Sequence, residues 1–308
     1  MLLPYKPASG VFPPVVHFHI PKTGGSSVHL AVQRALASEK AAVFPRVNDA
    51  EEARQLISDH RFIGTPLFIS GHMSPLHLRT DGRFVRTAIV RDPVEHLISY
   101  FCYSFKTRYE SREQLEFMRS CKGYREKRFS GADVERWVAR WLGDNPQTRF
   151  LAVDGAGTAD ATAFGIARDA LDGCDLVGTT DRMSMFLMML GSIAGLSIGA
   201  EVHVNVSSHG IIDEAAESLR DRLRPYIGFD DQLYAHAVRR NANSPEWRAM
   251  LEQPPIPDLS EDASRLTLPE RARYFLQASG YERRASIKRR VESVRSWIGD
   301  LKPVTRRL

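Results

Sequence analysis

The sequence predicts an α/β fold of three layers, in which helices flank a central, mainly parallel sheet and a helical appendage follows at the C-terminus. Short runs rich in β-branched residues alternate with longer segments whose apolar residues recur at helical spacing, as in successive strand–helix–strand units. The chain has 308 residues, of which 43% are hydrophobic and 26% charged. A chain of this length and composition can bury a sizeable core, which excludes a disordered protein or a collagen-like repeat.

Four strands are expected, each a short apolar run. The first opens with Val15-Val16-His17-Phe18, and the third leads through Ile89 and Val90 into a charged segment. Alternating β-branched and aromatic residues favour strands over helices in such short runs. The predicted strands are residues 15–20, 67–70, 84–90 and 176–178.

Helices are expected between and after these strands. Val28, Ala31 and Val32 show the spacing of one helix face. Trp137 and Trp141, four residues apart, are expected to pack on one side of their helix. The methionine-rich segment that contains Met183, Met185, Met188 and Met189 is expected to fill core rather than to bind a ligand. The predicted helices are residues 27–37, 94–105, 133–142, 183–196 and 215–224.

Composition divides the chain into three parts. Residues 1–14 form a proline-containing extension, and residues 15–244 form the main domain. Residues 245–308 hold a stiff Pro-Pro-Ile-Pro linker at 254–257 and then two segments, 268–278 and 281–301, that read as helices.

The basic character of the chain belongs to its tail. The formal net charge is +5, and residues 281–308 alone contribute nine Lys/Arg against three Asp/Glu. Apolar residues at helical spacing within this segment make a basic amphipathic helix, which suits an anionic membrane surface or an acidic glycan. A helix packed on the main domain with solvated arginines is an equal alternative. No recognised nucleic-acid-binding module accompanies the tail, so a nucleic-acid partner is not expected.

Cysteine count and hydropathy indicate the compartment. Three cysteines without CxxC spacing predict neither a disulfide framework nor a zinc site. No run approaches the roughly 18 apolar residues of a membrane span, and the first residues lack the apolar core of a secretory signal. A soluble cytoplasmic protein is expected, peripheral at the inner membrane face if the tail binds anionic lipid.

The first candidate site is the segment Pro21-Lys22-Thr23-Gly24-Gly25-Ser26-Ser27 between a strand and a helix. Glycines allow close backbone approach, amide groups at a helix N-terminus point at an anion, and the helix dipole favours negative charge. The sequence therefore predicts a phosphate-binding loop and a P-loop-like fold, although Lys22 precedes the glycines and the Walker A pattern is absent. The predicted ligand-binding residues are Lys22, Thr23, Gly24, Gly25, Ser26 and Ser27.

The second candidate site follows the third predicted strand. Asp92 is a good N-cap and Pro93 suits the first helical position, so Asp92 is expected to be structural. Arg91 ends the strand at the edge where open α/β sheets bind ligands, and a guanidinium there can grip a phosphate bidentately. Ser99, two turns into the helix, can offer a hydroxyl group to the same phosphate.

These two segments together resemble the sulfotransferase superfamily. The strand–PKTGGSS–helix resembles the loop that holds the 5′-phosphosulfate of 3′-phosphoadenosine-5′-phosphosulfate (PAPS), and the segment from Arg91 to Ser99 resembles the 3′-phosphate motif. The likeness extends over roughly residues 15–240 and is greatest to the carbohydrate group that includes heparan-sulfate 2-O-sulfotransferase, with further similar segments at 145–151, 177–182 and 203–207. His96 stands where the family usually has Arg, which implies a cofactor contact that is weakened or pH-sensitive.

The resemblance also implies a catalytic base. A Gly-His pair at this place carries the base in the 2-O group, and His72 of Ser70-Gly71-His72-Met73-Ser74 matches it. Ser70 stands where that group has a second histidine, so the base role falls to His72 alone. Sulfuryl transfer to an alcohol needs a base and cations around the leaving phosphate, and Lys22 can supply the cation. His17 and His19 share a strand face but lack an evident third ligand, so they are expected to be structural rather than a metal pair.

The expected function is a PAPS-dependent O-sulfotransferase that acts on a carbohydrate or glycolipid, without a metal. His72 and Lys22 are the expected catalytic residues. Two alternatives stay open: a P-loop nucleotide kinase, against which the missing Walker A pattern speaks, and a nucleotide-binding protein that transfers nothing.

Overall fold

The computed structural model describes residues 14–36, 50–60, 68–78, 84–106, 111–153, 157–194, 196, 198, 211–245 and 247. The chain divides into two units, Met1–Ile256 and Pro257–Leu308, and all described residues belong to the first. Several predicted features lie outside the described residues: the extension up to residue 13, the similar segment at 203–207, the linker at 254–257 and the two segments expected to be tail helices. Among the described helices, none is long and apolar enough to cross a bilayer.

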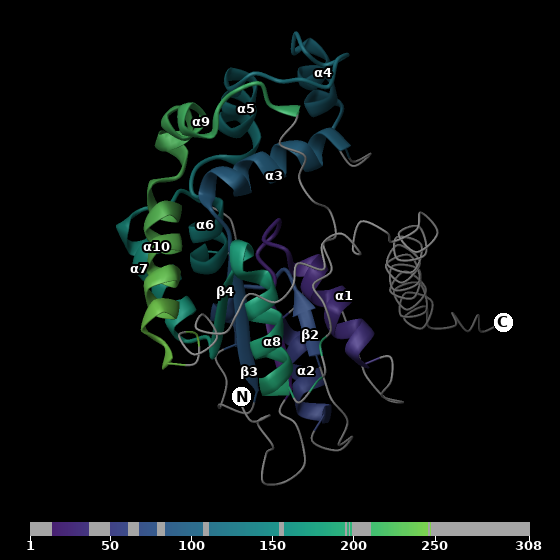
Figure 1. The fold of residues 1–308 in the computed structure, drawn as a ribbon, viewed down its shortest axis with the longest axis vertical. Helices are drawn as coiled ribbons and strands as arrows, with labels where there is room; N and C mark the ends of the chain where they lie inside the picture. Colours follow the sequence, from purple (N-terminus) through teal and green to yellow (C-terminus); the bar gives the residue numbers. More distant parts are fainter. Residues whose placement is uncertain are drawn as a thin grey trace, which may run out of the picture. The chain divides into compact units, whose positions relative to one another are not determined.

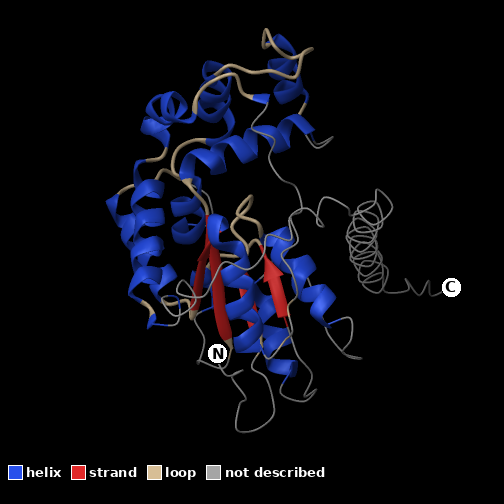
Figure 2. Cartoon of the chain, viewed as in Figure 1, coloured by secondary structure: helices blue, strands red, loops and turns tan. Residues whose placement is uncertain are grey.

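The sheet has four strands, all parallel, in the order β2-β1-β3-β4 (Figures 1 and 2). Val15 of β1 pairs with Phe68 of β2 on one side and with Val85 of β3 on the other. The carboxyl ends of all four strands therefore meet at one edge. The strands are β1 Val15–Phe18, β2 Phe68–Gly71, β3 Val85–Val90 and β4 Leu176–Thr179. The expected parallel α/β fold is confirmed.

Ten α-helices are described around the sheet. The predicted helix at 133–142 is one α-helix followed by a π-helical segment, Val138–Leu142. The bounds of the helices are α1 Gly25–Leu36, α2 Ala50–His60, α3 Pro93–Lys106, α4 Arg112–Ser120, α5 Gly131–Trp137, α6 Pro146–Val153, α7 Ala161–Asp172, α8 Met183–Ala194, α9 Ala216–Leu223 and α10 Gly228–Asn243.

Two apolar clusters make the three layers. Val16, Phe18 and Ile69 point to one face of the sheet, where α2, α6, α7 and α10 cover them. Val15 and Phe68 point to the other face, which α1 and α8 cover. This alternation follows from the two-residue period of a strand, because successive side chains lie on opposite faces.

A third cluster forms a helical lobe beyond the carboxyl edge, built from α3, α4, α5 and α9 (Figure 1, top). Trp137 is buried there, and Trp141 packs beside it with a ring-centroid separation of 6.4 Å. The expected packing role of both tryptophans is confirmed. Met183 is buried against the sheet and Met185 and Met189 pack partly against it, which confirms the core role of these three.

The N-termini of α6 and α10 cap each other. The Asn145 Oδ1 atom accepts the backbone N–H groups of Phe229 and Asp230, at 2.7 and 3.0 Å. In return, the buried Asp230 carboxylate accepts the backbone N–H groups of Gln147 and Thr148 and the Thr148 hydroxyl group. Each helix thus satisfies donors of the other that would otherwise be orphaned. This exchange fixes α6, and hence Gln147, beside the carboxyl edge of the sheet.

The raised pKa of Asp230 predicts that the stability of the fold depends on pH. Burial raises its pKa to about 6, against the hydrogen bonds from Thr148 and Gln147 that lower it. The unfolded value is about 4, so the stability that protonated Asp230 contributes is fully present below pH 4 and is lost as the pH rises through 6. Relative to Asp230→Asn, which cannot titrate, the wild type should lose about 2–3 kcal/mol of unfolding free energy between pH 4 and pH 7. Urea unfolding of both proteins at the two pH values measures this, and a pH-independent difference would contradict it.

Candidate functional site: the loop between β1 and α1

The loop from His19 to Gly24 is held by its carbonyl groups. Each of three carbonyl oxygens accepts a hydrogen bond from a side chain of another segment: that of His19 from His72 Nδ1 (2.9 Å), that of Pro21 from His96 Nε2 (2.7 Å) and that of Lys22 from Arg91 Nη1 (3.3 Å). The donors come from the end of β2, from α3 and from the end of β3. The three sequence motifs thus converge on one loop, as the parallel sheet predicted.

Amide groups on this loop are available to a ligand. In the described part of the chain, the backbone N–H groups of Gly24, Gly25 and Ser26 make no hydrogen bond. They lie at the N-terminus of α1, where the helix dipole adds partial positive charge. Lys22 has φ +68°, in the left-handed region that a side chain rarely adopts. An anion of phosphate type is the ligand that such a donor set fits.

The two glycines are required by close contacts. Gly24 has φ +86°, and a Cβ atom there would lie 2.4 Å from Met183 Cε. A Cβ atom on Gly25 would lie 2.0 Å from Cδ2 of the His19 ring. Gly24 therefore allows the loop to pass over α8, and Gly25 allows the imidazole of His19 to lie against the start of α1.

Thr23 has a different role from the predicted one. Its side chain is completely buried, its hydroxyl group donates to the carbonyl of Ile20 at 2.8 Å, and its amide donates to the same oxygen at 3.3 Å. Both protons of Thr23 are thus used inside the loop, so this residue shapes the loop and does not offer a donor to a ligand. The ligand roles of Lys22, Gly24, Gly25, Ser26 and Ser27 stay predictions.

Arg91 lies at the carboxyl end of β3, with 17% of its side chain exposed. Its Nη1 atom donates to the backbone carbonyl oxygen of Lys22, and its Nη2 atom lies 3.4 Å from the Glu95 carboxylate. Its backbone is clamped by Gln147, whose side-chain amide accepts from the Arg91 N–H and donates to the Arg91 carbonyl, both at 2.8 Å. Gln147 lies in the segment 145–151 named in the sequence analysis, but its role in positioning Arg91 was not predicted, because no local pattern links it to residue 91.

Asp92 caps α3, as predicted. Its carboxylate accepts the Glu95 amide at 3.1 Å, and its other oxygen bonds to Arg220 of α9. Arg220 also pairs with Asp231 at 2.8 Å. The residue after Arg91 is therefore anchored to both the helical lobe and α10.

His96 corrects an expectation. The imidazole is fully buried, and burial lowers its pKa to about 3, although the hydrogen bond to Pro21 opposes this shift. A carbonyl can only accept, so neutral His96 donates from Nε2 at all physiological pH values. A contact that changes with pH is therefore not expected from His96, which donates to the loop backbone, and the weakened cofactor contact stays a prediction. Ser99 is buried three residues further along α3, on the neighbouring position of the same helix face.

The tautomer of His72 is set by the loop. Its ring is exposed, and Nδ1 lies 2.9 Å from the carbonyl oxygen of His19. Since that oxygen can only accept, Nδ1 carries the proton and Nε2 carries the lone pair in the neutral ring. His72 is thus arranged as a proton acceptor at the sheet edge where Arg91 and Lys22 lie.

His19 has a role that the sequence did not reveal. Its ring stacks on that of His72, with centroids 4.5 Å apart and planes inclined by 28°. Its own carbonyl orients the same histidine, so His19 holds His72 through both backbone and side chain. His17 lies beneath, fully buried and bonded to Thr87 Oγ1 at 3.0 Å, and burial lowers its pKa to about 3. The expected structural role of His17 is confirmed.

The ammonium group of Lys22 makes a cation–π contact with an aromatic ring. Its Nζ atom lies 3.8 Å from the centroid of the Tyr103 ring on α3, and 43% of that tyrosine is exposed. A cation–π contact of this kind stabilises the ammonium group without neutralising it. Among the described residues, no group of three or more His, Cys, Asp or Glu side chains could hold a metal ion.

Comparison with known proteins gives a weak likeness. No protein-family model and no curated protein sequence matches the chain. A solved sulfotransferase from Alicyclobacillus acidocaldarius matches in structure, with 12% identity, a TM-score of 0.40, and coverage of 77% of this chain and 100% of that one.

Gly25→Ala tests whether the glycine makes room for the histidine pair. The added Cβ atom should displace the His19 ring and with it the stacked His72 ring, so the NMR signals of both imidazoles should shift. Gly165→Ala in α7 is the matched control, because a Cβ atom there meets no atom within 4 Å. The control should stabilise the fold by up to about 1 kcal/mol, as expected for replacing a helix-interior glycine. Unchanged imidazole signals in Gly25→Ala would exclude the proposed contact.

Proposed function

We propose that the chain is a sulfotransferase that moves the sulfuryl group of PAPS to a hydroxyl group of a carbohydrate or glycoconjugate. The observation that carries the proposal is the convergence at one sheet edge of an anion-binding loop, an arginine and a correctly protonated histidine. The loop offers the amides of Gly24, Gly25 and Ser26, and Lys22 adds a full charge. Arg91 supplies a second cation from the neighbouring strand.

Different residues of the site bind different parts of PAPS in this proposal. The amides of the loop and Lys22 suit the 5′-phosphosulfate, which carries the transferring group. Arg91, with Ser99 two turns into α3, suits the 3′-phosphate that distinguishes PAPS from other adenine nucleotides. In this proposal the Arg91–Glu95 ion pair gives way to the phosphate, a stronger bidentate partner for a guanidinium.

The reaction needs one proton transfer and one displacement. The acceptor oxygen forms a bond to sulfur while the bond from sulfur to the 5′-phosphate oxygen breaks. His72 takes the hydroxyl proton at Nε2, and Nδ1 keeps its hydrogen bond to the carbonyl of His19. Lys22 stabilises the charge that develops on the leaving phosphate, and 3′,5′-adenosine diphosphate departs. His19 stabilises the imidazolium form of His72 through the stacked ring and the carbonyl dipole.

The carbohydrate class of the acceptor rests on the sequence resemblance and is proposed on that ground. Residues 281–308 are proposed to attach the enzyme to an anionic membrane surface or an acidic glycan through the basic amphipathic helix predicted for them. They lie outside the described residues.

Arg91 is predicted to read the 3′-phosphate. The wild type should bind 3′,5′-adenosine diphosphate more tightly than 5′-AMP, and Arg91→Ala should remove about ten- to hundredfold of that preference, the effect of one charged hydrogen-bonding contact. Calorimetry with both nucleotides measures it. Arg86→Ala, on the same strand at the opposite edge of the sheet, is the control and should leave the preference intact. Equal affinity of the wild type for the two nucleotides would refute this assignment.

His72 is predicted to act on the acceptor and not on the nucleotide. His72→Ala should lower sulfuryl transfer by about 10²–10⁴-fold and leave the affinity for 3′,5′-adenosine diphosphate nearly unchanged. Lys22→Ala should damage both, because Lys22 meets the phosphosulfate in the ground state and the transition state. The assay is single-turnover transfer from radiolabelled PAPS to acceptors in a lysate of the source cell. His77→Ala, an exposed histidine after β2, serves as the control.

Three outcomes would count against the function. Wild-type transfer by His72→Ala would remove the base assignment. Nucleotide binding without transfer to any acceptor would favour a non-catalytic nucleotide-binding protein. Mg²⁺-dependent turnover of ATP would favour a kinase.

A further inference from the structure

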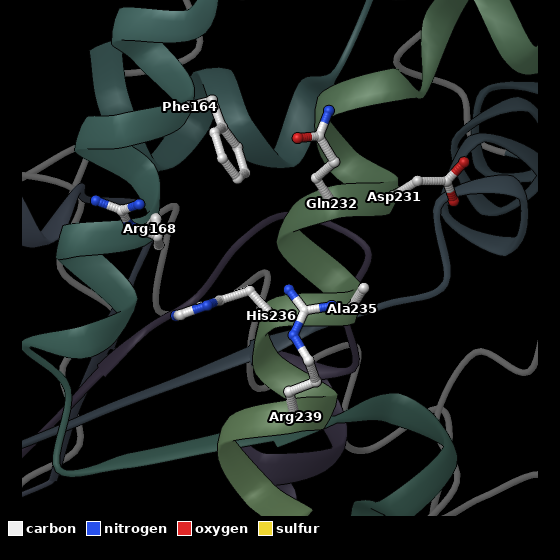
Figure 3. A pocket seen from close by; sticks show the side chains of 7 residues that line it. All are labelled: Phe164, Arg168, Asp231, Gln232, Ala235, His236 and Arg239. Atoms are coloured by element: carbon white, nitrogen blue, oxygen red, sulfur yellow. The ribbon is translucent and has the colours of Figure 1, made fainter.

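A groove between α7 and α10 lies outside the site described so far. Its volume is about 440 Å³, and no residue of the loop between β1 and α1 lines it. Phe164 and Arg168 of α7 face Gln232, His236 and Arg239 of α10 across it (Figure 3). Ala235 and Asp231 complete the lining.

The carboxylates near the groove are already engaged, and its cations are not fully compensated. Asp231 pairs with Arg220 and points away from Phe164 and Arg168 (Figure 3). Asp172 accepts from His236 Nε2 at 2.7 Å. Within the residues that the structure describes, the guanidinium of Arg168 pairs only with the adjacent Asp169, in an exposed ion pair worth little in free energy. Arg239 is exposed and has no ion pair or hydrogen bond within the described part of the chain.

The walls of the groove are tied together at both ends. The rings of Phe164 and Phe229 stack at one end, with centroids 5.7 Å apart. At the other end the His236–Asp172 pair joins α10 to α7, and Arg240 donates to the carbonyl of Leu171 at 3.2 Å. The groove is therefore preformed, which lowers the entropic cost of binding a ligand.

From these features we infer that the groove between α7 and α10 binds an acidic oligosaccharide, one whose sugar units carry carboxylate or sulfate groups. The guanidinium groups of Arg168 and Arg239, on opposite walls, suit such oxygen anions bidentately. The Phe164 ring offers an apolar face to a pyranose ring, and the Gln232 carbonyl oxygen can accept a sugar hydroxyl. Neither a neutral sugar nor a free inorganic ion would use all of these groups.

The groove also has a position relative to the reaction edge. Asp231, at its N-terminal end, is joined through Arg220 to Asp92, the residue after Arg91. From Gln232 to Arg239 the groove runs about 10 Å along α10, away from that edge.

The test measures direct binding to the full chain without any nucleotide. The probes are a galacturonate hexamer, a sulfated maltohexaose and neutral maltohexaose, titrated by calorimetry at one fixed salt concentration. The variant Arg168→Ala/Arg239→Ala should bind the acidic probes at least tenfold more weakly than the wild type. The control Arg112→Ala/Arg224→Ala removes the same charge from exposed ion pairs elsewhere and should change affinity less than twofold.

The outcomes separate the groove from the general charge of the protein. Equal losses in the two double variants would assign binding to bulk electrostatics or to the basic tail and overturn the inference. Absence of wild-type binding to both acidic probes, or equal binding of neutral maltohexaose, would also overturn it. Affinity for 3′,5′-adenosine diphosphate is measured in parallel. If that nucleotide fails to bind while the groove variants behave as expected, the inference that the groove binds an acidic oligosaccharide is supported and the proposed function fails.

Discussion

The site depends on three hydrogen bonds to the carbonyl groups of a single loop. The carbonyls of His19, Pro21 and Lys22 accept from His72, His96 and Arg91, and these bonds fix those three side chains. The amides that stay available to a ligand are those that follow, of Gly24, Gly25 and Ser26. One constraint thereby produces both the anion cradle and its surroundings. Lys22, whose own carbonyl accepts one of these bonds, has φ +68°, in the left-handed region.

The surroundings of the loop are rigid for separate reasons. Buried, neutral His96 donates to the loop at any physiological pH, so the cradle does not loosen as protons bind elsewhere. Gln147 holds the backbone of Arg91 from α6, which is itself fixed by the exchange of caps between Asn145 and Asp230. A change at Asp230 therefore reaches Arg91 through two short steps of hydrogen bonding, without any contact to a ligand.

Local patterns predicted the sheet and the loop because those features are encoded locally. The apolar runs around Val16 and Ile89 identify strands by themselves, and the glycines after Lys22 identify the turn into α1. Helices α2, α4, α6, α7 and α10 were not predicted. In α10 the buried side chains are Asp230, Leu233 and Ala237, so its buried face does not show as a run of apolar residues at helical spacing. The partners of the site, His19 for His72 and Gln147 for Arg91, come from separate segments. Contacts of that kind follow from tertiary packing and leave no trace in spacing along the chain.

The parallel sheet also constrains how the chain reaches this structure. Val15 pairs with Phe68, and Thr87 pairs with Leu176, so each of these ladders closes a loop of more than about 50 residues. Tight hairpins, which pair neighbouring strands early, play no part in this sheet. Strand β1 comes first in the sequence but pairs with β2 and β3, which both come later. Its backbone groups therefore stay unpaired until those strands have formed. Folding is therefore expected to be slow for a protein of this size, and its most exposed intermediate is one in which the strand that carries the loop stands without its neighbours.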